Sequence, residues 1–465
     1  MQQLSTSIPS YHGSIITSDP ILMELTVLNV NSGSEEDELL QKDRTSKKEI
    51  SVGMVFLLVT GELMGAGILA LPYAVVTSGY FGVILIVVIG LLSSYGGVKL
   101  GRCWQIIIER WPQYDTNIKD PFPVIGYICF GKCAKEFVRL NVYLMLYGCD
   151  VVILLLSSQL VQSLTTTYPI SYCNWILIIG LCLMPTTWLE SPKDFWQAGV
   201  AAFLATAISM VIVSVQLVGD LLVKNINDTV KPEINVQAVM FTYGTIAFMN
   251  GGSATFPTIQ NDMKDKKKFS FTYGMASIVI NGVYLVLGVL SFLILSKETK
   301  PNILDTLPLN WSTKIAQVLI IIHLFVVFCV LLNPVLQDLE NVFNIPFKFC
   351  WQRVLIRSSI VLSIIFVAES VPNFGNILNI IGASSVTLLS FVFPSVFYFK
   401  LVSMNAPPGE VWPKWVIPWY EKAFILFLIT FTVAGGLSST YLSVKQMVST
   451  NTFVMPCYFR TWTHI

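Results

Sequence analysis

The sequence predicts an all-α integral membrane protein, made of two inverted repeats of five membrane-spanning helices and one extra helix. Three observations predict this fold. Hydrophobic residues make up 54% of the chain and charged residues 12%, whereas soluble domains carry roughly 25% charged residues. Eleven apolar windows have the length of about 20 residues that a membrane span needs. Glycines interrupt the first and the sixth window at corresponding places.

Residues 1–48 come before the first window and are polar, serine-rich and acidic, so they predict a disordered cytosolic tail. They contain no basic segment followed by an apolar one, and no cleaved signal peptide is expected. Residues 49–449 form the predicted transmembrane domain, and residues 450–465 a short extracytosolic tail. The windows lie near residues 51–76, 80–108, 137–163, 173–190, 196–219, 237–261, 270–296, 313–341, 353–371, 374–400 and 421–448.

The two interrupted windows share one pattern. Gly65-Ala66-Gly67 comes before Pro72, and Gly251-Gly252 comes before Pro257, with proline five residues after the last glycine both times. A single glycine cluster fits close helix packing. The matched pair favours broken helices instead, which lipid-buried segments tolerate only beside protein or a wet cavity. Broken helices at matching places point to a transporter with its substrate at the breaks.

The windows divide into one block at residues 51–219, a second block at residues 237–400 and an extra helix at residues 421–448. Each block has five spans and begins with an interrupted one. Because five is an odd number, the second block enters the membrane upside down relative to the first.

Lysine and arginine predict the orientation, because cytosolic loops carry an excess of both. With the N-terminus in the cytosol, most of the 29 lysines and arginines lie on the cytosolic side. The two glycosylation sequons, at Asn227 and Asn310, then fall in outer loops. Eleven spans place the C-terminus outside. Cys173 and Cys457 share the outer side, and the sequence leaves their pairing open.

The breaks predict a binding site for an amino acid. Unwinding at residues 65–67 exposes N–H groups and the positive end of the following half-helix, which suit a carboxylate. Carbonyl groups at residues 248–250 would accept hydrogen bonds from an ammonium group. No charged residue lies between Val239 and Gln260, which favours a neutral substrate side chain. The predicted substrate-binding residues are Gly65, Ala66, Gly67, Phe248, Met249, Asn250, Gly251 and Gly252.

Ionisable residues inside membrane spans are candidates for ion coupling. Glu62 lies about one turn before the first break, Asp150 near the middle of the third span and His323 in the eighth. His323 also fits a structural histidine, and Glu62 a carboxylate paired with a polar neighbour. Three further acids near helix ends are expected to be solvated: Asp338, Glu340 and Glu369.

Three stretches resemble the amino acid/auxin permease family, which includes proton-coupled and vesicular amino-acid transporters. Gly65-Ala66-Gly67-Ile68-Leu69-Ala70-Leu71-Pro72-Tyr73-Ala74 looks like its first-helix signature. Residues 248–251, then Pro257 and Asp262-Met263-Lys264-Asp265-Lys266-Lys267-Lys268-Phe269, look like its sixth-helix signature. Pro372-x-Phe374-Gly375, with Ile381-Gly382-Ala383 and Phe393-Pro394, resembles its tenth.

The resemblance covers residues 47–448 and implies a leucine-transporter-like fold of eleven helices with the N-terminus inside. It also implies movement of small neutral amino acids or amino-acid-like neurotransmitters. Many members carry Asn just before the first-helix glycines, where this chain has Gly61-Glu62-Leu63-Met64. The coupling and the substrate of Asn-bearing members therefore do not carry over to this chain.

Sodium is the competing coupling ion. In this fold a sodium site commonly uses hydroxyl groups of the eighth span against first-helix carbonyls. Residues 315–341 contain no Ser or Thr, and hard cations need oxygen ligands. Only Asn333, Gln337, Asp338 and the backbone offer oxygens there, which favours protons, or exchange, over sodium.

The tail contains one sorting pattern. Glu35, Leu39 and Leu40 fit an acidic dileucine motif within Glu35-Glu36-Asp37-Glu38-Leu39-Leu40. This pattern resembles endosomal and lysosomal sorting signals read by adaptor proteins, and a plain acidic disordered run is the alternative. The predicted location is therefore the plasma membrane or an endosomal, lysosomal or vesicle membrane.

Two other function classes remain as alternatives. An amino-acid-sensing receptor would signal through residues 1–48, and a channel would need a polar stripe along several spans. Nothing indicates an enzyme, since the chain shows neither a nucleophile arrangement nor a Walker-type loop. The 9 Cys form no metal-type cluster with the 3 His, and the net charge of +1 indicates no nucleic-acid partner. The expected partners are an amino acid, a coupling proton and membrane lipid, without a cofactor.

Two expectations concern packing. Gly82 and Gly90 in the second span are expected to serve helix packing at most and to tolerate alanine. Residues 123–137 are expected to form an interfacial helix.

Overall fold

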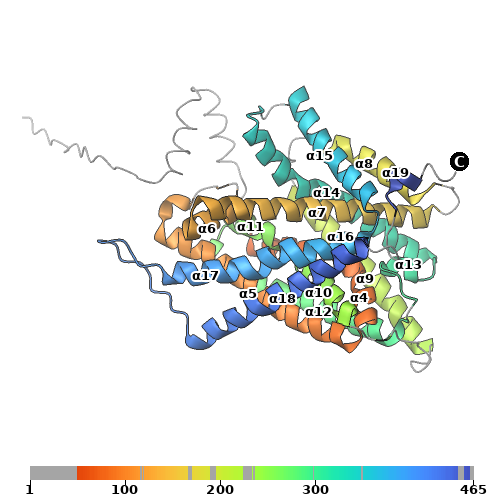
Figure 1. Cartoon of the computed structure of the whole chain (residues 1–465), viewed down its shortest axis with the longest axis horizontal. Coiled ribbons are helices and arrows are strands. Elements are labelled where there is room, and N and C mark those ends of the chain that lie inside the picture. Colours follow the sequence, from red (N-terminus) through yellow and green to blue (C-terminus); the bar gives the residue numbers. More distant parts are fainter. Residues whose placement is uncertain are drawn as a thin grey trace, which may run out of the picture. The chain divides into compact units, whose positions relative to one another are not determined.

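The computed structural model is all-helical in the part of the chain that it describes (Figure 1). That part comprises residues 50–115, 118, 120–165, 170–188, 195–223, 233, 236–296, 298–346, 349–448 and 455–460. The predicted tail at residues 1–48, with Glu35, Leu39 and Leu40, lies outside the described residues, as does Asn227.

Seven helical segments among the described residues are long and apolar enough to cross a membrane. They are α5 (Tyr80–Arg110), α7 (Lys132–Leu164), α9 (Phe195–Val223), α12 (Phe269–Ile294), α14 (Trp311–Val342), the run Phe374–Ser403 and α18 (Trp419–Val448). The run Phe374–Ser403 consists of α16 (Phe374–Ile381), the π-helical η6 (Gly382–Val392) and α17 (Phe393–Ser403).

Shorter helices complete the chain. They are α3 (Val52–Leu63), α4 (Leu71–Ser78), α6 (Pro121–Phe130), α8 (Tyr172–Trp188), α10 (Val236–Met249), α11 (Phe256–Asn261), α13 (Ile303–Thr306), α15 (Trp351–Ser370) and α19 (Cys457–Arg460). Every apolar window falls on one of these helices or on a consecutive run of them. The count of eleven membrane spans stays a prediction.

Side-chain caps fix the starts of several helices. Ser51 accepts a hydrogen bond from the N–H of Met54 before α3, Asn310 from Thr313 before α14, and Asn373 from Asn376 before α16. Such caps satisfy N–H groups that have no partner within the helix. The stretch 123–137 is not one helix, because α6 ends at Phe130 and α7 starts after Gly131, whose φ is +81°.

Helices at the same position in the two predicted blocks pack against each other. The second helices, α5 and α12, are in contact, and so are the third, α7 and α14, and the fourth, α8 and α15. Figure 1 shows α8 beside α15. Each block also has a short helix after its second span, α6 in the first block and α13 in the second. This pairing is the packing expected of two related halves.

The extra helix α18 is fastened to both blocks. Gly436 lies so close to η6 that an added Cβ would stand 2.6 Å from the carbonyl oxygen of Ala383. Glu421 forms an ion pair with the buried Lys99 of α5 and accepts a hydrogen bond from Tyr95 at 3.0 Å. The buried ammonium of Lys99 needs a partner of opposite charge, so this contact with the partly buried Glu421 fixes the start of α18 against α5.

A disulfide joins Cys173 to Cys457. The bond connects α8 with α19 near the C-terminus, and it answers the pairing that the sequence left open. Disulfides persist in oxidising compartments, so the bond agrees with the predicted outer location of both cysteines.

Candidate functional site

The first interruption lies between α3 and α4. Helix α3 ends at Leu63, Gly65 is extended with φ −83° and ψ −157°, and one 3₁₀ turn, η1 (Ala66–Leu69), leads into α4. Pro72 sits in the first turn of α4, where its missing N–H costs no hydrogen bond. In the described part of the chain, the N–H groups of residues 65–67 have no hydrogen-bond partner.

The second interruption, between α10 and α11, has the same order of elements with a different glycine conformation, since Gly251 has φ −91° and ψ 21°. Helix α10 ends at Met249, and the 3₁₀ turn η4 (Gly252–Ala254) leads into α11, which carries Pro257 in its first turn. The carbonyl of Phe248 accepts a hydrogen bond from the N–H of Gly251 at 3.0 Å. A carbonyl oxygen has two lone pairs, so this one can accept a further bond from an ammonium group.

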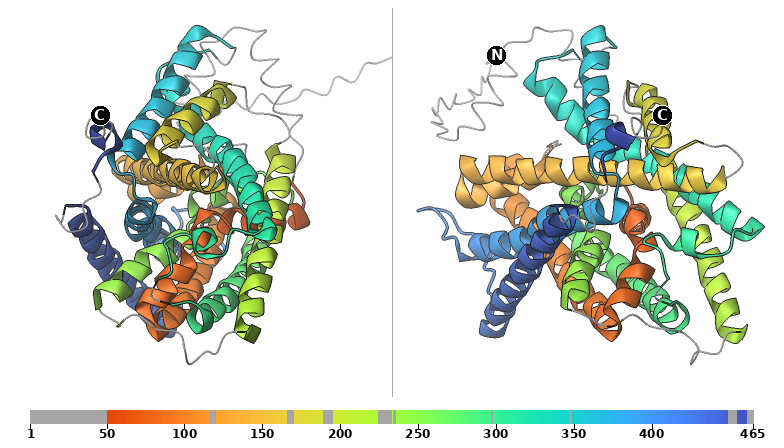
Figure 2. Two further views of the ribbon diagram at one scale, coloured as in Figure 1. Left: turned by 90° about the vertical axis from the view of Figure 1, so that its right-hand side faces the viewer. Right: turned by 45° about the vertical axis from the view of Figure 1, so that its right-hand side comes forward.

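The two interruptions touch each other. A Cβ added to Gly67 would lie 2.8 Å from Cγ of Met249 and 3.1 Å from Cδ1 of Phe248. A Cβ added to Gly252 would lie 2.7 Å from the Phe256 ring and 3.4 Å from the carboxyl carbon of Glu62. The glycines thus permit a close approach that no other residue allows. Figure 2 shows these segments, in orange and green, side by side among the helices.

Glu62 joins the two interruptions directly. Its carboxylate oxygens accept the hydroxyl of Thr255 at 2.5 and 2.6 Å, and the same hydroxyl lies 3.1 Å from the carbonyl oxygen of Gly252. One hydroxyl has one proton, so it donates to one of these acceptors at a time. Thr255 stands two residues before Pro257, where the first interruption has Ala70 before Pro72. That difference is the only sequence signal for the contact.

Tyr284 is a second residue that the sequence does not reveal. Its hydroxyl, on the buried side of α12, lies 2.5 Å from the carbonyl oxygen of Leu63 and 3.0 Å from that of Met249. Leu63 and Met249 are the last residues of α3 and α10. The hydroxyl has one proton, so it donates to the carbonyl end of α3 or to that of α10, one at a time. Neither carbonyl has a partner within its own helix.

The second interruption is also fastened to the π-helical segment η6. The Ser253 and Ser390 hydroxyls are 2.8 Å apart, and Ser390 donates to the carbonyl of Asn250 at 3.3 Å. Gly382 of η6 approaches α10 so closely that a Cβ would lie 2.8 Å from Cβ of Phe248. π-Helical segments often occur at functional sites. Gly382 belongs to the Ile381-Gly382-Ala383 stretch that resembles the family's tenth-helix signature, but the sequence did not place it at the site.

Comparison with known proteins decides the family. Residues 48–441 match the family described as "Transmembrane amino acid transporter protein". The chain belongs to this family. Among its relatives in Arabidopsis thaliana is the amino acid transporter AVT1C, 24% identical over 81% of this chain and 68% of the relative. AVT1J is 21% identical over 89% of this chain and 95% of the relative.

Solved structures show the fold of this amino acid transporter family member. An inward-facing structure of Mhp1, a nucleobase-cation-symport-1 family transporter, aligns with a TM-score of 0.54 at 14% identity. The alignment covers 90% of this chain and 93% of Mhp1. The chain is therefore a multi-pass membrane protein with leucine-transporter-like neighbours, and its named relatives are transporters rather than enzymes.

The three ion-coupling candidates of this family member lie in different surroundings. Glu62 touches the second interruption, as described above. Asp150 is fully buried in α7, and neither of its carboxylate oxygens has a hydrogen-bond partner in the described part of the chain. His323 is buried in α14 with Nδ1 3.0 Å from the carbonyl oxygen of Ala202 in α9. The structure thus brings only Glu62 of the three into hydrogen-bond contact with an interruption.

Two acids expected on the solvated surface are buried. Glu340 is 1% exposed and lies 2.5 Å from Nε of Arg357 and 3.1 Å from Nε of Arg353. Glu369 is 7% exposed. The expectation was wrong for both, because proximity to a helix end does not exclude coverage by a neighbouring helix. Asp338 faces Arg139 at 3.8 Å.

The expectation that alanine is tolerated is wrong for Gly82, where backbone stands in the way, and alanine at Gly90 would have to displace a side chain. A Cβ at Gly90 would overlap the side-chain amide of Asn281 in α12, and one at Gly82 would overlap Ser78 and lie 2.9 Å from Cα of Val75. These glycines lie where helices approach most closely. Gly282 in α12 has open space instead, with no atom within 4 Å of an added Cβ.

The sequon residue Asn310 is exposed and stands at the start of α14. Its Oδ1 accepts the N–H of Thr313 at 2.8 Å. Glycans attach to Nδ2, so the cap and a glycan can coexist on this residue.

Proposed function

We propose that the chain is a secondary active transporter of small neutral amino acids or amino-acid-like neurotransmitters, working by alternating access around broken helices. One observation carries the proposal: the two interruptions meet, with unpaired N–H groups on one side and carbonyl groups with spare lone pairs on the other. An amino acid supplies the matching carboxylate and ammonium. The proposed substrate-binding residues are Gly65, Ala66, Gly67, Phe248, Met249, Asn250, Gly251 and Gly252.

The proposed architecture is eleven spans, with the first and sixth broken, in repeats at residues 51–219 and 237–400 and an extra helix at residues 421–448. The N-terminus is cytosolic and the C-terminus extracytosolic. Contacts between α5 and α12, α7 and α14, and α8 and α15 support the repeat. The disulfide between Cys173 and Cys457 supports the orientation, since it suits the outer side.

We propose the proton as coupling ion, with Glu62 as the residue that carries it. The support is the contact between Glu62 and Thr255, through which a change of charge in one broken helix reaches the other. The absence of hydroxyl side chains from residues 315–341 argues against sodium. Asp150 and His323 are weaker candidates than Glu62, because neither has a hydrogen bond to an interruption.

The proposed location is the plasma membrane or an endosomal, lysosomal or vesicle membrane, with Glu35, Leu39 and Leu40 as a sorting signal. Replacing Leu39 and Leu40 together by alanine should shift the protein toward the cell surface. An unchanged distribution would remove the signal.

Uptake into proteoliposomes tests the function. Purified protein should accumulate labelled neutral amino acids, and an inward proton gradient should increase the accumulation. Acidic and basic amino acids should compete poorly, because no charged residue of the second interruption meets their side chains. Uptake that requires sodium and does not depend on pH would show that sodium, not the proton, is the coupling ion. The absence of uptake for every amino acid would contradict the proposal of transport.

A further inference from the structure

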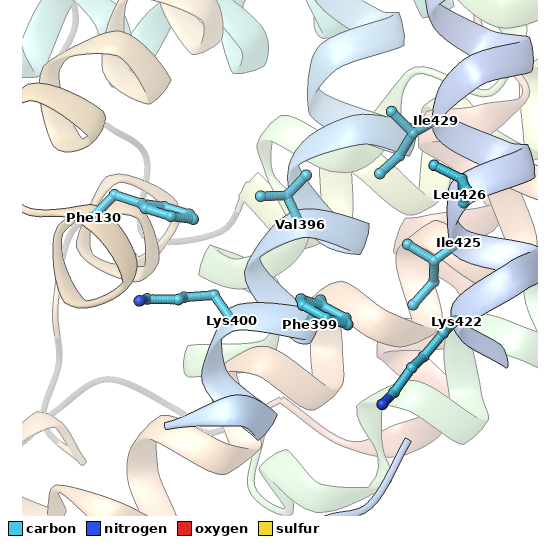
Figure 3. A pocket seen from close by; sticks show the side chains of 8 residues that line it. All are labelled: Phe130, Val396, Phe399, Lys400, Lys422, Ile425, Leu426 and Ile429. Atoms are coloured by element: carbon cyan, nitrogen blue, oxygen red, sulfur yellow. The ribbon is translucent and has the colours of Figure 1, made fainter. Parts of the chain in front are cut away.

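A groove lies away from the two interruptions. It has a volume of about 560 Å³ and is formed by the end of α6, by α17 and by the start of α18. Figure 3 shows its lining side chains: Phe130, Val396, Phe399, Lys400, Lys422, Ile425, Leu426 and Ile429. The volume falls in the range of roughly 300–1,000 Å³ typical of small-molecule sites.

The groove has one charged end and one apolar end. Lys400 lies near the end of α17 and Lys422 near the start of α18, on either side of the connection at residues 404–418. Ile425, Leu426 and Ile429 follow Lys422 along α18, away from that connection, and Val396 precedes Lys400 by one turn of α17. The groove is therefore cationic beside the connection and aliphatic further along the helices.

The two lysines have no counter-ion in the described part of the chain. The ammonium nitrogen of Lys400 lies 5.7 Å from the centre of the Phe130 ring. Glu421, the acid next to Lys422, is engaged by Lys99 and Tyr95 of α5 instead. The predicted orientation puts this end of α17 and α18 on the cytosolic side, where the membrane leaflet is rich in anionic lipid.

We propose that this groove binds an anionic phospholipid, with an acyl chain along the aliphatic wall and the negative headgroup between Lys400 and Lys422. Charge complementarity selects this occupant over a neutral lipid or a sterol, since neither places a net negative charge at the lysine end. The site is independent of the amino-acid site, and its test does not need transport.

Binding of phosphatidylserine to the purified full-length protein tests the proposal. Apparent affinity is read from thermal stabilisation in detergent as phosphatidylserine is added. Each lysine near the membrane surface contributes about 1 kcal/mol to attraction of anionic lipid. Lys400→Gln with Lys422→Gln should therefore weaken binding by about 30-fold, whereas Lys400→Arg with Lys422→Arg should retain it.

A matched control removes the same charge elsewhere. Lys132 and Lys135 lie at the start of α7, on the same predicted side of the membrane. The variant Lys132→Gln with Lys135→Gln should leave the affinity within about threefold of the parent's. A second variant, Leu426→Trp, keeps both charges and fills the aliphatic wall. Leu426→Trp should weaken binding of phosphatidylserine as well. It tests the proposal by itself if the double lysine variant does not fold.

Three outcomes would overturn the proposal. One is equal stabilisation by phosphatidylcholine, which would assign the groove to acyl chains without headgroup selection. Another is an equal loss in the Lys132 and Lys135 control, which would indicate unspecific attraction to charge. The third is displacement of phosphatidylserine by a sterol with both lysines intact, which would assign the groove to a sterol.

Discussion

The two interruptions share their order of elements and differ in backbone angles and in side-chain anchors, since ψ is −157° at Gly65 and 21° at Gly251. Each runs from a helix through a glycine and one 3₁₀ turn into a helix that starts with proline. The second is hydrogen-bonded to η6 through Ser253 and Ser390. The polar contacts of the first lead to Thr255 in the second interruption and to Tyr284 in α12.

The different side-chain contacts suit the two interruptions to different roles. The second interruption is tied to a neighbouring helix and is suited to act as the fixed wall of a site. The first is held through Glu62, a group that can gain or lose a proton. Protonation of Glu62 would remove the charge that attracts the Thr255 hydroxyl, so the contact between the interruptions becomes sensitive to protons.

Side chains at the glycines should have the largest effect. Gly67→Val and Gly252→Val should abolish uptake. The Cβ of a valine at residue 67 would overlap Met249, and that of a valine at residue 252 would overlap the ring of Phe256. Gly282→Val is the matched control, since an added Cβ there has open space, and it should transport like the parent. Normal amounts of Gly67→Val and Gly252→Val at the membrane with parental uptake would show that the site lies elsewhere.

Glu62→Gln should come next. The amide keeps a hydrogen bond with Thr255 but cannot carry a proton, so acid stimulation of uptake should disappear while exchange continues. A proton moving through 100 mV supplies about 2.3 kcal/mol, which corresponds to about 50-fold accumulation. His323→Gln should retain the stimulation, because His323 bonds to α9 rather than to an interruption. Loss of stimulation in His323→Gln and not in Glu62→Gln would move the proton site to α14.

Tyr284→Phe should have an intermediate effect. It removes the one proton that the carbonyls of Leu63 and Met249 share, so one buried carbonyl loses its hydrogen bond, at a cost of roughly 1–3 kcal/mol. The midpoint of thermal unfolding should fall and uptake should slow. Tyr273→Phe removes a hydroxyl from the same helix that bonds to Ser93 at 3.3 Å, away from the interruptions. Equal loss of uptake in both variants would make Tyr284 an ordinary packing residue.

The sequons give the smallest functional effect and test whether the two blocks are inverted. Asn227→Gln and Asn310→Gln should each raise gel mobility when the protein is made in a eukaryotic secretory pathway, with uptake unchanged. In a variant that stays at the cell surface, such as Leu39→Ala with Leu40→Ala, an antibody should reach an epitope after residue 465 without permeabilisation of the cells. An epitope that is reached only after permeabilisation would mean that the odd span count is wrong.

Local patterns were enough to predict the helices and the places where they break. Apolar windows and the Gly-x4-Pro spacing are encoded within a few residues, and the helices begin and end near the expected positions. Thr255, Tyr284 and Ser390 were not predictable, because a single hydroxyl in an apolar span does not indicate which distant group it will meet. Gly90 shows the same limit, since only its neighbour Asn281 in α12 reveals that an alanine there would have to displace the Asn281 amide.

If one interruption binds a carboxylate and the other an ammonium group, a ligand needs both groups to bind. Thermal stabilisation of the purified protein is compared for a transported neutral amino acid, for the amine that lacks its carboxylate and for the acid that lacks its amino group. The account predicts stabilisation by the amino acid alone in the parent and in Gly282→Val, and by none of the three in Gly67→Val. Equal stabilisation by the amine or by the acid would contradict it, because one of the two interruptions would then have no part in binding.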